Sequence, residues 1–563
     1  MVMAISKTPL TLISDFNLSV LARLLNHAQQ DTPLEATLSP FGQPYQTLAA
    51  PPEREDAVVM VWCRAEGVLP SFAQGLQFEA VDEQVLEGEV RHFAQQLRHH
   101  ATQVKHLLVS SWVLPPQERG YGMLDWQPGL GLRYLLARAN LLLAQQLADA
   151  ANIHLLDTQA WLQSAGNKAA SPRMAYASKT PYGNGVFEAA AADILAVLDG
   201  LQGRSRRLVL VDLDDTLWGG IIGETGWQGI RLGGHDHGGE AFQDFQRALK
   251  GLIKRGVLVG VVSKNTEEVA LAAFEKHPEM VLKKEDLAGW RINWQDKAQN
   301  VVELSQQINL GLQSVVFIDD NPAERGRVRE ALPQVLVPEW PKQPSEYAAF
   351  LRAMNCFELP ALSDEDRQRA AMVRAERARQ ETKGTLANHG DWLQSLGMQV
   401  RLSPITPVNL PRVEQLFNKT NQMNISTRRL SESQIHHWAQ QPGHVLWAAS
   451  VTDRFGDSGL TGILAVALEG EEAVITDLIL SCRVMGRQVE HLLLHRGVAW
   501  AMAQGAKRLV AHYRPTDRNA PCLSFLRGSG LTEAPEHTFS WSCVTPYPQP
   551  QHVMLEELPH VQG

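Results

Sequence analysis

Two carboxylates stand two positions apart directly after a short apolar run. The run is Leu-Val-Leu-Val at residues 208–211, and the carboxylates are Asp212 and Asp214. Such a run is typical of a strand that is buried on both faces of a parallel sheet. Ligands of open α/β sheets bind at the carboxyl ends of the strands. We therefore expect both carboxylates at the mouth of a site.

Further polar groups follow the same rule. Two more apolar runs end in polar side chains: 256–262 leads to Ser263, Lys264 and Asn265, and 314–318 leads to Asp319 and Asp320. Lys297 lies between these runs in a polar segment, 294–300, that we expect to be helical. Apolar residues at helical spacing across 242–253 predict a helix between the first two strands. This alternation of strands and helices predicts a parallel α/β core.

The motif Asp212-Leu-Asp214-Asp-Thr216 resembles the first motif of the haloacid dehalogenase (HAD) phosphotransferase superfamily. The resemblance implies that Asp212 attacks phosphorus and forms an aspartyl-phosphate. It also implies that Asp214 protonates the leaving group and later activates water. Ser263 and Lys297 would then hold the phosphoryl oxygens.

Phosphoryl transfer also needs a divalent cation to offset negative charge. Mg²⁺ prefers hard oxygen ligands, and the candidates are Asp212, Asp214 through its backbone carbonyl, Asp319 and Asp320. Lys297 would offset the same cluster of carboxylates. The alternative is that these acids are solvated caps at strand ends. Four motifs in the expected order argue against it.

Composition and charge narrow the class of protein. The chain has 563 residues, so several domains are expected. A net charge of −9 without a basic stripe argues against a nucleic-acid partner. Five cysteines without a Cys-x-x-Cys pair fit a reducing cytoplasm rather than disulfides or a zinc site. No segment has the pattern of a signal peptide or of a membrane span.

We divide the chain into four segments: an α/β domain at 1–200, the phosphotransferase core at 205–358, a charged helical connector at 360–388, and a third domain at 391–563. In the first domain, apolar runs predict strands at 58–62, 106–110 and 153–156, and an amphipathic helix at 132–151. In the third domain, similar runs predict strands at 447–451, 462–466, 473–480 and 508–511. Both outer domains therefore combine strands and helices.

The third domain holds a strand, an Arg-x-x-Gly turn and a helix. The strand at 473–480 leads to Arg483 and Gly486, and an amphipathic helix begins near Gln488. This order resembles the pyrophosphate-binding motif of the GNAT acyltransferases, in which backbone N–H groups at a helix N-terminus bind phosphate. That motif has a small residue where this chain has Gln488, which argues against ordinary CoA binding.

Three signatures in this order resemble the FkbH-like family. They are Asp-Leu-Asp-Asp-Thr-Leu-Trp-Gly-Gly-Ile-Ile-Gly-Glu at 212–224, Asn-Lys-Thr-Asn-Gln-Met-Asn at 418–424 with Thr-Arg-Arg at 427–429, and Ser-Cys-Arg-Val-Met-Gly-Arg at 481–487. The resemblance implies an α/β fold with a HAD-type Rossmann-like core. An N-terminal SGNH-hydrolase-like α/β domain and a C-terminal GNAT-like α+β domain would flank this core.

The same resemblance implies an activity. Such enzymes take the D-glyceryl group of 1,3-bisphosphoglycerate, remove phosphate, and load glyceryl onto the phosphopantetheine thiol of an acyl carrier protein. The product serves polyketide or related biosynthesis. The implied cofactors are Mg²⁺ and the phosphopantetheine of the partner. We expect neither a nucleic-acid nor a membrane partner.

A glyceryl thioester on an enzyme cysteine is a further implication of the resemblance. Cys482 is the first candidate because it lies at a strand end beside Arg483 and next to a helix N-terminus, where a thiolate is favoured. Cys522 is the second. His512 ends a strand and could act as a general base toward a thiol. A buried structural thiol and a structural histidine are the alternatives.

Groups suited to hold the substrate or the carrier gather around the same motifs. They are Thr216, Asn265, Asn418, Thr420, Asn421, Gln422, Asn424, Arg428, Arg429, Arg483, Gly486 and Asn519. The arginine pair at 428–429 could meet a phosphate or an acidic carrier protein. A polar loop after a helix end explains 418–424 equally well, and solvated charges explain the arginines.

The N-terminal domain has lost part of its hydrolase pattern. Ser14 and Asp15 follow the first apolar run, where SGNH-type hydrolases place a Gly-Asp-Ser block. That order is absent, and so is an Asp-x-x-His pair around 175–200. We therefore expect docking or structural support from this domain rather than hydrolysis.

These patterns favour a cytoplasmic glyceryl–carrier-protein synthase that combines a HAD-type phosphatase with an acyltransferase. Three alternatives remain: a HAD-type phosphatase of a soluble small metabolite, a non-catalytic scaffold that docks a carrier protein, and an acetyl-CoA-dependent acetyltransferase. The complete acid and lysine set argues against the scaffold. Gln488 argues against the acetyltransferase.

Overall fold

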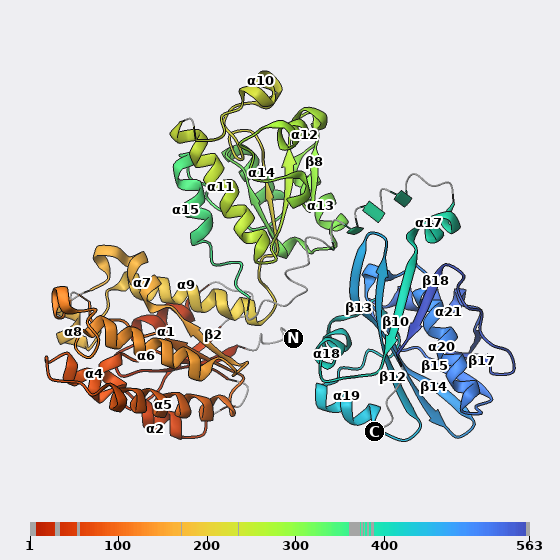
Figure 1. Ribbon diagram of the computed structural model, residues 1–563, viewed down its shortest axis with the longest axis horizontal. Helices are drawn as coiled ribbons and strands as arrows, with labels where there is room; N and C mark the ends of the chain where they lie inside the picture. Colours follow the sequence, from red (N-terminus) through yellow and green to blue (C-terminus); the bar gives the residue numbers. More distant parts are fainter. Residues whose placement is uncertain are drawn as a thin grey trace, which may run out of the picture. The chain divides into compact units, whose positions relative to one another are not determined.

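The computed structural model describes residues 7–558, apart from 29–33, 53, 55–56, 117, 171, 235, 360–371, 373–374, 377, 380–381 and 384–387. The chain divides into two compact units, Met1–Arg207 with Arg352–Leu362 and Leu208–Leu351 with Ser363–Gly563. The second unit contains two separate sheets, so three sheets are described in turn (Figure 1).

The first unit is built on a five-stranded parallel sheet with the order β2-β1-β3-β4-β5. Its strands are β1 Thr8–Ile13, β2 Leu34–Leu38, β3 Val58–Val61, β4 His106–Ser110 and β5 Ile153–Leu156. Its helices are α1 Ser19–Asn26, α2 Pro44–Ala49, α3 Ala65–Val68, α4 Pro70–Gly75, α5 Glu83–Ala101, α6 Leu132–Leu147, α7 Thr158–Ala165, α8 Pro172–Ser178 and α9 Asn184–Leu201. Apolar clusters with α5 and α6 on one side and with α1 and α9 on the other bury both faces.

The second sheet is also parallel, with the order β8-β7-β6-β9. Its strands are β6 Leu208–Val211, β7 Leu258–Ser263, β8 Gly289–Ile292 and β9 Val315–Ile318. Its helices are α10 Ile222–Gly229, α11 His237–Lys254, α12 Glu267–Lys276, α13 Lys297–Gln307, α14 Pro322–Ala331 and α15 Pro344–Ala353. Because the strands are parallel, their carboxyl ends meet at one edge, as the sequence predicts.

The third sheet is mixed, with the order β16-β17-β15-β14-β13-β12-β10-β18, and β11 pairs with β14 beside this path. Its strands are β10 Met398–Ser403, β11 Met423–Asn424, β12 His444–Asp453, β13 Gly456–Glu469, β14 Glu472–Leu480, β15 Arg508–His512, β16 Thr532–Ala534, β17 Thr538–Ser542 and β18 Val553–Glu557. Its helices are α17 His389–Leu396, α18 Leu410–Lys419, α19 Glu432–Ala439, α20 Val489–Ala503 and α21 Ala520–Gly528. The multidomain α/β class is therefore confirmed.

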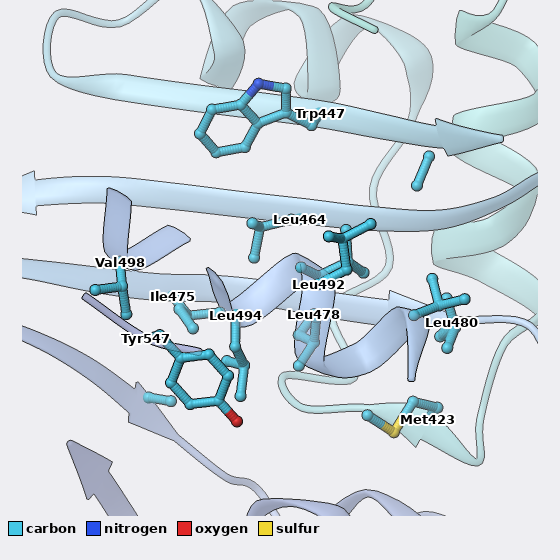
Figure 2. Packing of buried hydrophobic residues seen from close by; sticks show 14 of the residues in the cluster. Met423, Trp447, Leu464, Ile475, Leu478, Leu480, Leu492, Leu494, Val498 and Tyr547 are labelled. Atoms are coloured by element: carbon cyan, nitrogen blue, oxygen red, sulfur yellow. The ribbon is translucent and has the colours of Figure 1, made fainter. Parts of the chain in front are cut away.

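Apolar packing fixes α20 against this third sheet. Figure 2 shows Leu464 of β13, Leu478 of β14 and Leu492 of α20 in one cluster, and all three are fully buried. Full burial of a leucine side chain contributes about 1.5–3 kcal/mol. The loop between β14 and α20 is thus held at both ends by the core.

The strands β14 and β15 pair over only part of their length. Their parallel register ends at Ile475 and Ala511, and beyond this point β11 pairs with Ile479 and Leu480 of β14. The backbone of Ile425 continues this bridge, because its N–H donates to Leu478 and its carbonyl accepts from the N–H of Arg514. A segment between α18 and α19 therefore fills the gap where β14 and β15 separate.

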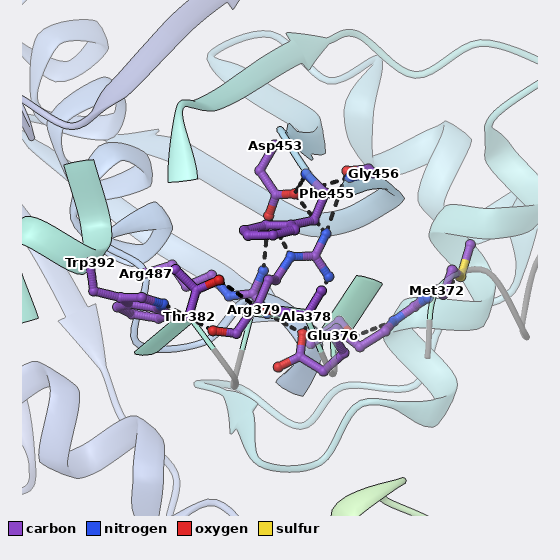
Figure 3. A network of polar contacts seen from close by, with 12 residues as sticks. Met372, Glu376, Ala378, Arg379, Thr382, Trp392, Asp453, Phe455, Gly456 and Arg487 are labelled. Carbon is purple, nitrogen blue, oxygen red and sulfur yellow. Dashed lines mark hydrogen bonds and ion pairs between the residues drawn. The ribbon is translucent and has the colours of Figure 1, made fainter. Parts of the chain in front are cut away.

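The described part of the connector docks on the third sheet. Figure 3 shows Arg379 against the β12–β13 turn, where its Nε lies 2.6 Å from Asp453 Oδ2. The side chains of both residues are almost completely buried. Most of the predicted connector helix at 360–388 lies outside the described residues. The described residues show that the connector packs against the third domain.

No helix in the described ranges has both the length and the apolar character needed to cross a membrane.

Candidate active site

The site is built where β6 and β9 end. Asp212 follows β6 directly, and its N–H donates to the carbonyl of Ile318, the last residue of β9. Asp319 follows β9, so the pairing of the two strands brings both aspartates to the same edge. Lys297 is the first residue of α13, which Asp296 caps by accepting from two backbone N–H groups. The helix therefore begins at Lys297, within the segment 294–300 that we expected to be helical, and not at its start.

Lys297 joins the two aspartates. Its Nζ lies 2.9 Å from Asp212 Oδ2 and 2.6 Å from Asp319 Oδ2, and the lysine side chain is only 4% exposed. Burial favours a lower pKa for Lys297, but the two carboxylates outweigh burial and raise that pKa. The lysine therefore stays charged and offsets part of the negative charge in the cluster.

Three carboxylates fit a divalent cation. Oxygens of Asp212, Asp319 and Asp320 lie within 4.8 Å of one another. Asp212 Oδ1 is buried and has no hydrogen-bond partner among the described residues. Burial, and then the Asp212 charge, raise the pKa of Asp319 to about 7 and raise the pKa of Asp320. An unpartnered oxygen beside crowded hard ligands is the arrangement that Mg²⁺ would satisfy.

The Asp214 carboxylate lies outside this acidic group. Its Oδ1 accepts from Trp218 Nε1 at 2.9 Å and from the N–H of Ile222 at 3.1 Å. Its Oδ2 accepts from Asn265 Nδ2 at 3.0 Å. Both oxygens therefore accept hydrogen bonds from uncharged donors, which fix the orientation of the side chain. The predicted metal contact of Asp214 concerns its backbone carbonyl and stays a prediction.

Other predicted groups line the same strand ends. Ser263 ends β7, is almost fully buried, and its Oγ accepts from Asn265 Nδ2 at 3.2 Å. Thr216 is fully buried, and its hydroxyl donates to Asp320 Oδ1 at 3.2 Å while it accepts from the N–H of Asp320 at 3.1 Å. Thr216 therefore positions Asp320, whereas Ser263 lies beside the groups that hold Asp214.

Sequence reasoning missed two residues of this site. Trp218 donates a hydrogen bond to Asp214, but from the sequence it was included only as part of the motif at 212–224 and was given no role. Arg325 donates from Nη1 to the carbonyls of Asp319 and Asp320 at 2.8 and 2.7 Å and thereby fixes the acidic loop. Trp218 follows Asp214 at helical spacing, which was an available signal. Nothing in the local pattern singles out Arg325.

The two cysteine candidates differ in access. Cys482 begins a short 3₁₀ turn, Cys482–Val484, after β14 and is exposed. Cys522 lies in α21 and is fully buried, and burial raises the pKa of its thiol to about 12. Cys482 is the better placed of the two for reaction with a partner. His512 ends β15, is exposed, and its Nδ1 lies 3.1 Å from Thr538 Oγ1.

The asparagine-rich motif forms its own loop. Asn424 is fully buried: its amide donates to the carbonyl of Thr420, and its Oδ1 accepts from the N–H groups of Ser426 and Thr427. Asn418 donates to the carbonyl of Leu430. These contacts are internal, while Gln422 is exposed.

The remaining predicted contacts in the third domain are also made within the protein. Arg428 pairs with buried Asp477, and Arg429 donates to the side chain of Asn421. Asn519 is fully buried and donates to the carbonyls of Asn424 and Arg514. The structure therefore brings these side chains together around β11, where they bind other groups of the protein.

The turn residues Arg483 and Gly486 lie between β14 and α20. Arg483 reaches Met372 Sδ at 2.9 Å, and the N–H of Gly486 donates to Glu490 Oε1 at 2.6 Å.

In the N-terminal unit, Asp15 accepts from the backbone and side chain of Arg64, and the Ser14 hydroxyl donates to the carbonyl of Trp62. The Ser14 hydroxyl is thus held by a backbone carbonyl.

The parallel sheet, with a buried lysine between two aspartates at its carboxyl edge, is a HAD-type Rossmann-like core. The N-terminal part of the protein BF1531 from Bacteroides fragilis, which contains a phosphatase domain and was crystallised with Mg, is similar to this chain. The identity is 25%, the match covers 63% of this chain and 95% of that chain, and the TM-score is 0.58.

Two further solved structures are similar to a smaller part. The ribosomal-protein-S18-alanine N-acetyltransferase from Escherichia coli is 11% identical over 26% of this chain and 94% of that chain, with a TM-score of 0.21. Rv2747 from Mycobacterium tuberculosis, crystallised with CoA and NLQ, is 16% identical over 24% of this chain and 72% of that chain, with a TM-score of 0.19. No family model and no curated protein matches the chain.

Proposed function

We propose that this protein transfers the D-glyceryl group of 1,3-bisphosphoglycerate to the phosphopantetheine thiol of an acyl carrier protein and removes the remaining phosphate. The contact of Lys297 with both Asp212 and Asp319 carries the phosphatase half. The likeness to a phosphatase domain crystallised with Mg supports the same half. The three sequence signatures support the acyl-transfer half.

Dephosphorylation would pass through Asp212. One oxygen of Asp212 attacks phosphorus, the bond from phosphorus to the substrate oxygen breaks, and Asp214 gives its proton to that oxygen. Water then attacks the aspartyl-phosphate and gives a proton to Asp214, so inorganic phosphate leaves and Asp212 is restored. Lys297 and Ser263 hold the phosphoryl oxygens. Asp212, Asp319 and Asp320 would hold Mg²⁺, which offsets the phosphoryl charge when it is bound.

Acyl transfer would use Cys482. Its thiolate attacks the carbonyl carbon of the acyl phosphate, so a C–S bond forms and the phosphate leaves. The pantetheine thiol, deprotonated by His512, then attacks this thioester, and the Cys482 thiolate leaves. The five cysteines, which all lie in the described part of the chain, form no disulfide with one another, and this fits the reducing cytoplasm in which we place the reaction.

The test is intact-protein mass spectrometry. The enzyme is mixed with freshly generated 1,3-bisphosphoglycerate, Mg²⁺ and phosphopantetheinylated carrier protein. Asp212→Asn, Cys482→Ala and the control Cys543→Ala are run alongside. We expect a glyceryl mass on the carrier with wild type and with Cys543→Ala. We expect a phosphorylated glyceryl mass, or none, with Asp212→Asn, and none with Cys482→Ala.

Other outcomes separate the alternatives. Phosphate release that depends on Asp212, without any carrier adduct, would favour a phosphatase of a soluble small metabolite. Binding of carrier protein without phosphate release would favour a scaffold. A carrier adduct that survives Cys482→Ala would exclude that thiol as the acyl relay.

A further inference from the structure

The loop between β14 and α20 contains two residues with a left-handed backbone. Gly486 has φ of 71°, and Gln488, which directly precedes α20, has φ of 67°. A loop of this kind in front of a helix presents backbone N–H groups that carry partial positive charge, and anions bind there. Whether an external anion can bind depends on what already occupies these groups.

A carboxylate of the chain occupies the loop. Glu490, the second residue of α20, accepts the N–H of Gly486 at its Oε1, 2.6 Å away. Glu490 is only 5% exposed, so its carboxyl group lies inside the loop rather than in solvent. Burial raises the pKa of Glu490, while the Gly486 N–H and Arg487 favour its charged form. In either protonation state, the carboxyl group fills the position of an anion oxygen.

Arg487, one of the two arginines of the loop, is also engaged in ion pairs within the protein. Arg487 is buried, and its Nη2 lies 2.6 Å from Glu376 Oε2 while its Nη1 lies 3.5 Å from Asp453 Oδ2 (Figure 3). Asp453 is shared with Arg379 of the connector. Two arginines thus face two carboxylates. The charges of these two arginines are balanced by the two carboxylates, so Arg487 does not offer an unpaired positive charge to a pyrophosphate.

The side chain at the last loop position adds bulk. Gln488 adopts a backbone conformation in which glycine is favoured, and its side chain stands where the resembling motif has a small residue. Close approach of a pyrophosphate to the backbone requires a small residue at such a position. Charge, hydrogen bonding and space therefore all oppose the same ligand.

We infer that this loop is closed to the pyrophosphate of CoA and that Glu490 is a specificity-determining residue. The inference rests on the proposed function, and it restricts the acyl acceptor to a pantetheine thiol that carries no nucleotide. A pantetheine arm on a carrier protein meets this condition, because it ends in a single phosphodiester. Repulsion of the wrong partner by a built-in charge is a common route to specificity.

The experiment compares thiol ligands on the full-length protein. Binding of CoA and of pantetheine is measured by calorimetry for wild type, Glu490→Ala, Glu490→Gln and the control Glu471→Ala. Glu471 pairs with Lys507 on the surface, and both side chains are about 70% exposed. We expect wild type and Glu471→Ala to bind CoA no more tightly than pantetheine.

Removal of the carboxylate should open the loop. We expect Glu490→Ala to bind CoA about tenfold more tightly than wild type while its affinity for pantetheine is unchanged. Inorganic pyrophosphate should compete for the gained affinity. Glu490→Gln removes charge but still fills the loop, so its gain should be smaller. Because Gln preserves the shape, this variant keeps the inference testable if Glu490→Ala fails to fold.

Two results would overturn the inference. One is tighter binding of CoA than of pantetheine by wild type, with competition by pyrophosphate. The other is an unchanged affinity for CoA in both folded Glu490 variants. Phosphate release and carrier loading are measured on the same samples. Loss of carrier loading with intact exclusion of CoA would refute the proposed function and leave the inference on the loop standing.

Discussion

Trp218 orients the carboxylate of Asp214, the residue that we propose as the proton donor. Its indole N–H is one of three uncharged donors on that carboxylate, and the ring itself is fully buried. We expect Trp218→Phe to lower kcat for phosphate release about fivefold to tenfold, the equivalent of about 1 kcal/mol for one hydrogen bond. KM should change little, because the indole is fully buried and its N–H donates to Asp214. Steady-state kinetics on a small phosphate ester measures both values.

A matched indole provides the control. Trp541 donates from its Nε1 to the carbonyl of Thr545 in the third domain. Trp541→Phe removes an equivalent bond and should leave kcat unchanged. Equal kcat values for Trp218→Phe and wild type would refute the positioning role of Trp218.

A buried histidine makes the first unit sensitive to acid. His100 is 2% exposed, its Nδ1 contacts the carbonyl of Leu48, and burial lowers its pKa. A histidine whose pKa is lowered in the folded state stabilises the protein above the unfolded pKa, about 6.5, and this contribution is lost as pH falls. We therefore expect wild type to lose more stability than His100→Gln between neutral and mildly acidic pH.

Urea unfolding at several pH values checks this difference. His99→Gln is the control, because His99 is the exposed neighbour on the same helix. A wild-type pH dependence that matches that of His100→Gln would show that His100 does not contribute.

Among the elements, the connector contributes a buried ion pair to the third sheet. Arg379 and Asp453 are 4% and 1% exposed, so loss of Arg379 leaves the buried Asp453 carboxylate with only the longer contact, 3.5 Å, to Arg487. Breaking such a pair costs about 3–5 kcal/mol. We expect Arg379→Ala to lower the free energy of unfolding of the third domain by this amount and to increase hydrogen exchange at the β12–β13 turn.

An exposed ion pair provides the control for this loss of stability. Arg401 and Glu556 join β10 and β18, but their side chains are 58% and 56% exposed. Surface pairs contribute about 0–1 kcal/mol, so Arg401→Ala should be nearly neutral. If the two variants lose the same stability, the connector pair is no more than a surface contact.

The pattern of apolar residues along the sequence predicted the strands that lead to the candidate active-site residues. The strands that lead to Asp212, Ser263 and Asp319 were predicted because buried parallel strands are continuous apolar runs. Several other strands were not predicted, among them the short strands β8 and β11. The four residues of β8 include Arg291, and β11 is a pair of residues inside a polar motif. Their identity as strands depends on partners far along the chain.

Residues near the acidic site could likewise be predicted from local sequence, whereas the contacts of the asparagine-rich loop could not. The acid and lysine set could be predicted because each member follows a strand or begins a helix. The role of Asn424 could not, because its partners are backbone groups within a folded loop. A group of hydrogen-bonding residues in the sequence indicates a polar cluster. Only the tertiary structure shows whether their side chains are available to a ligand or bind groups of the protein itself.

At the scale of the whole molecule, the three sheets have separate apolar clusters. We expect calorimetry to resolve more than one unfolding transition, since multidomain chains depart from two-state behaviour. Mg²⁺ should raise the midpoint of the transition of the phosphatase core and leave the others unchanged, because a ligand stabilises the part that binds it. Chelation with EDTA should reverse the shift.

Asp212→Asn is the control for that measurement. This variant removes one charged ligand of the proposed site, so its shift with Mg²⁺ should be smaller than that of wild type. An equal shift of all transitions would instead indicate a general salt effect.

The unequal access of the five thiols has a practical consequence. Cys482 is exposed, Cys356 and Cys543 are half-buried, and Cys63 and Cys522 are buried. A maleimide fluorophore should therefore attach first to Cys482 in the unmodified chain. The label would lie on the turn in front of α20, so its emission would report in real time when a partner protein approaches that turn. The native sequence thus carries its own attachment point for a spectroscopic reporter.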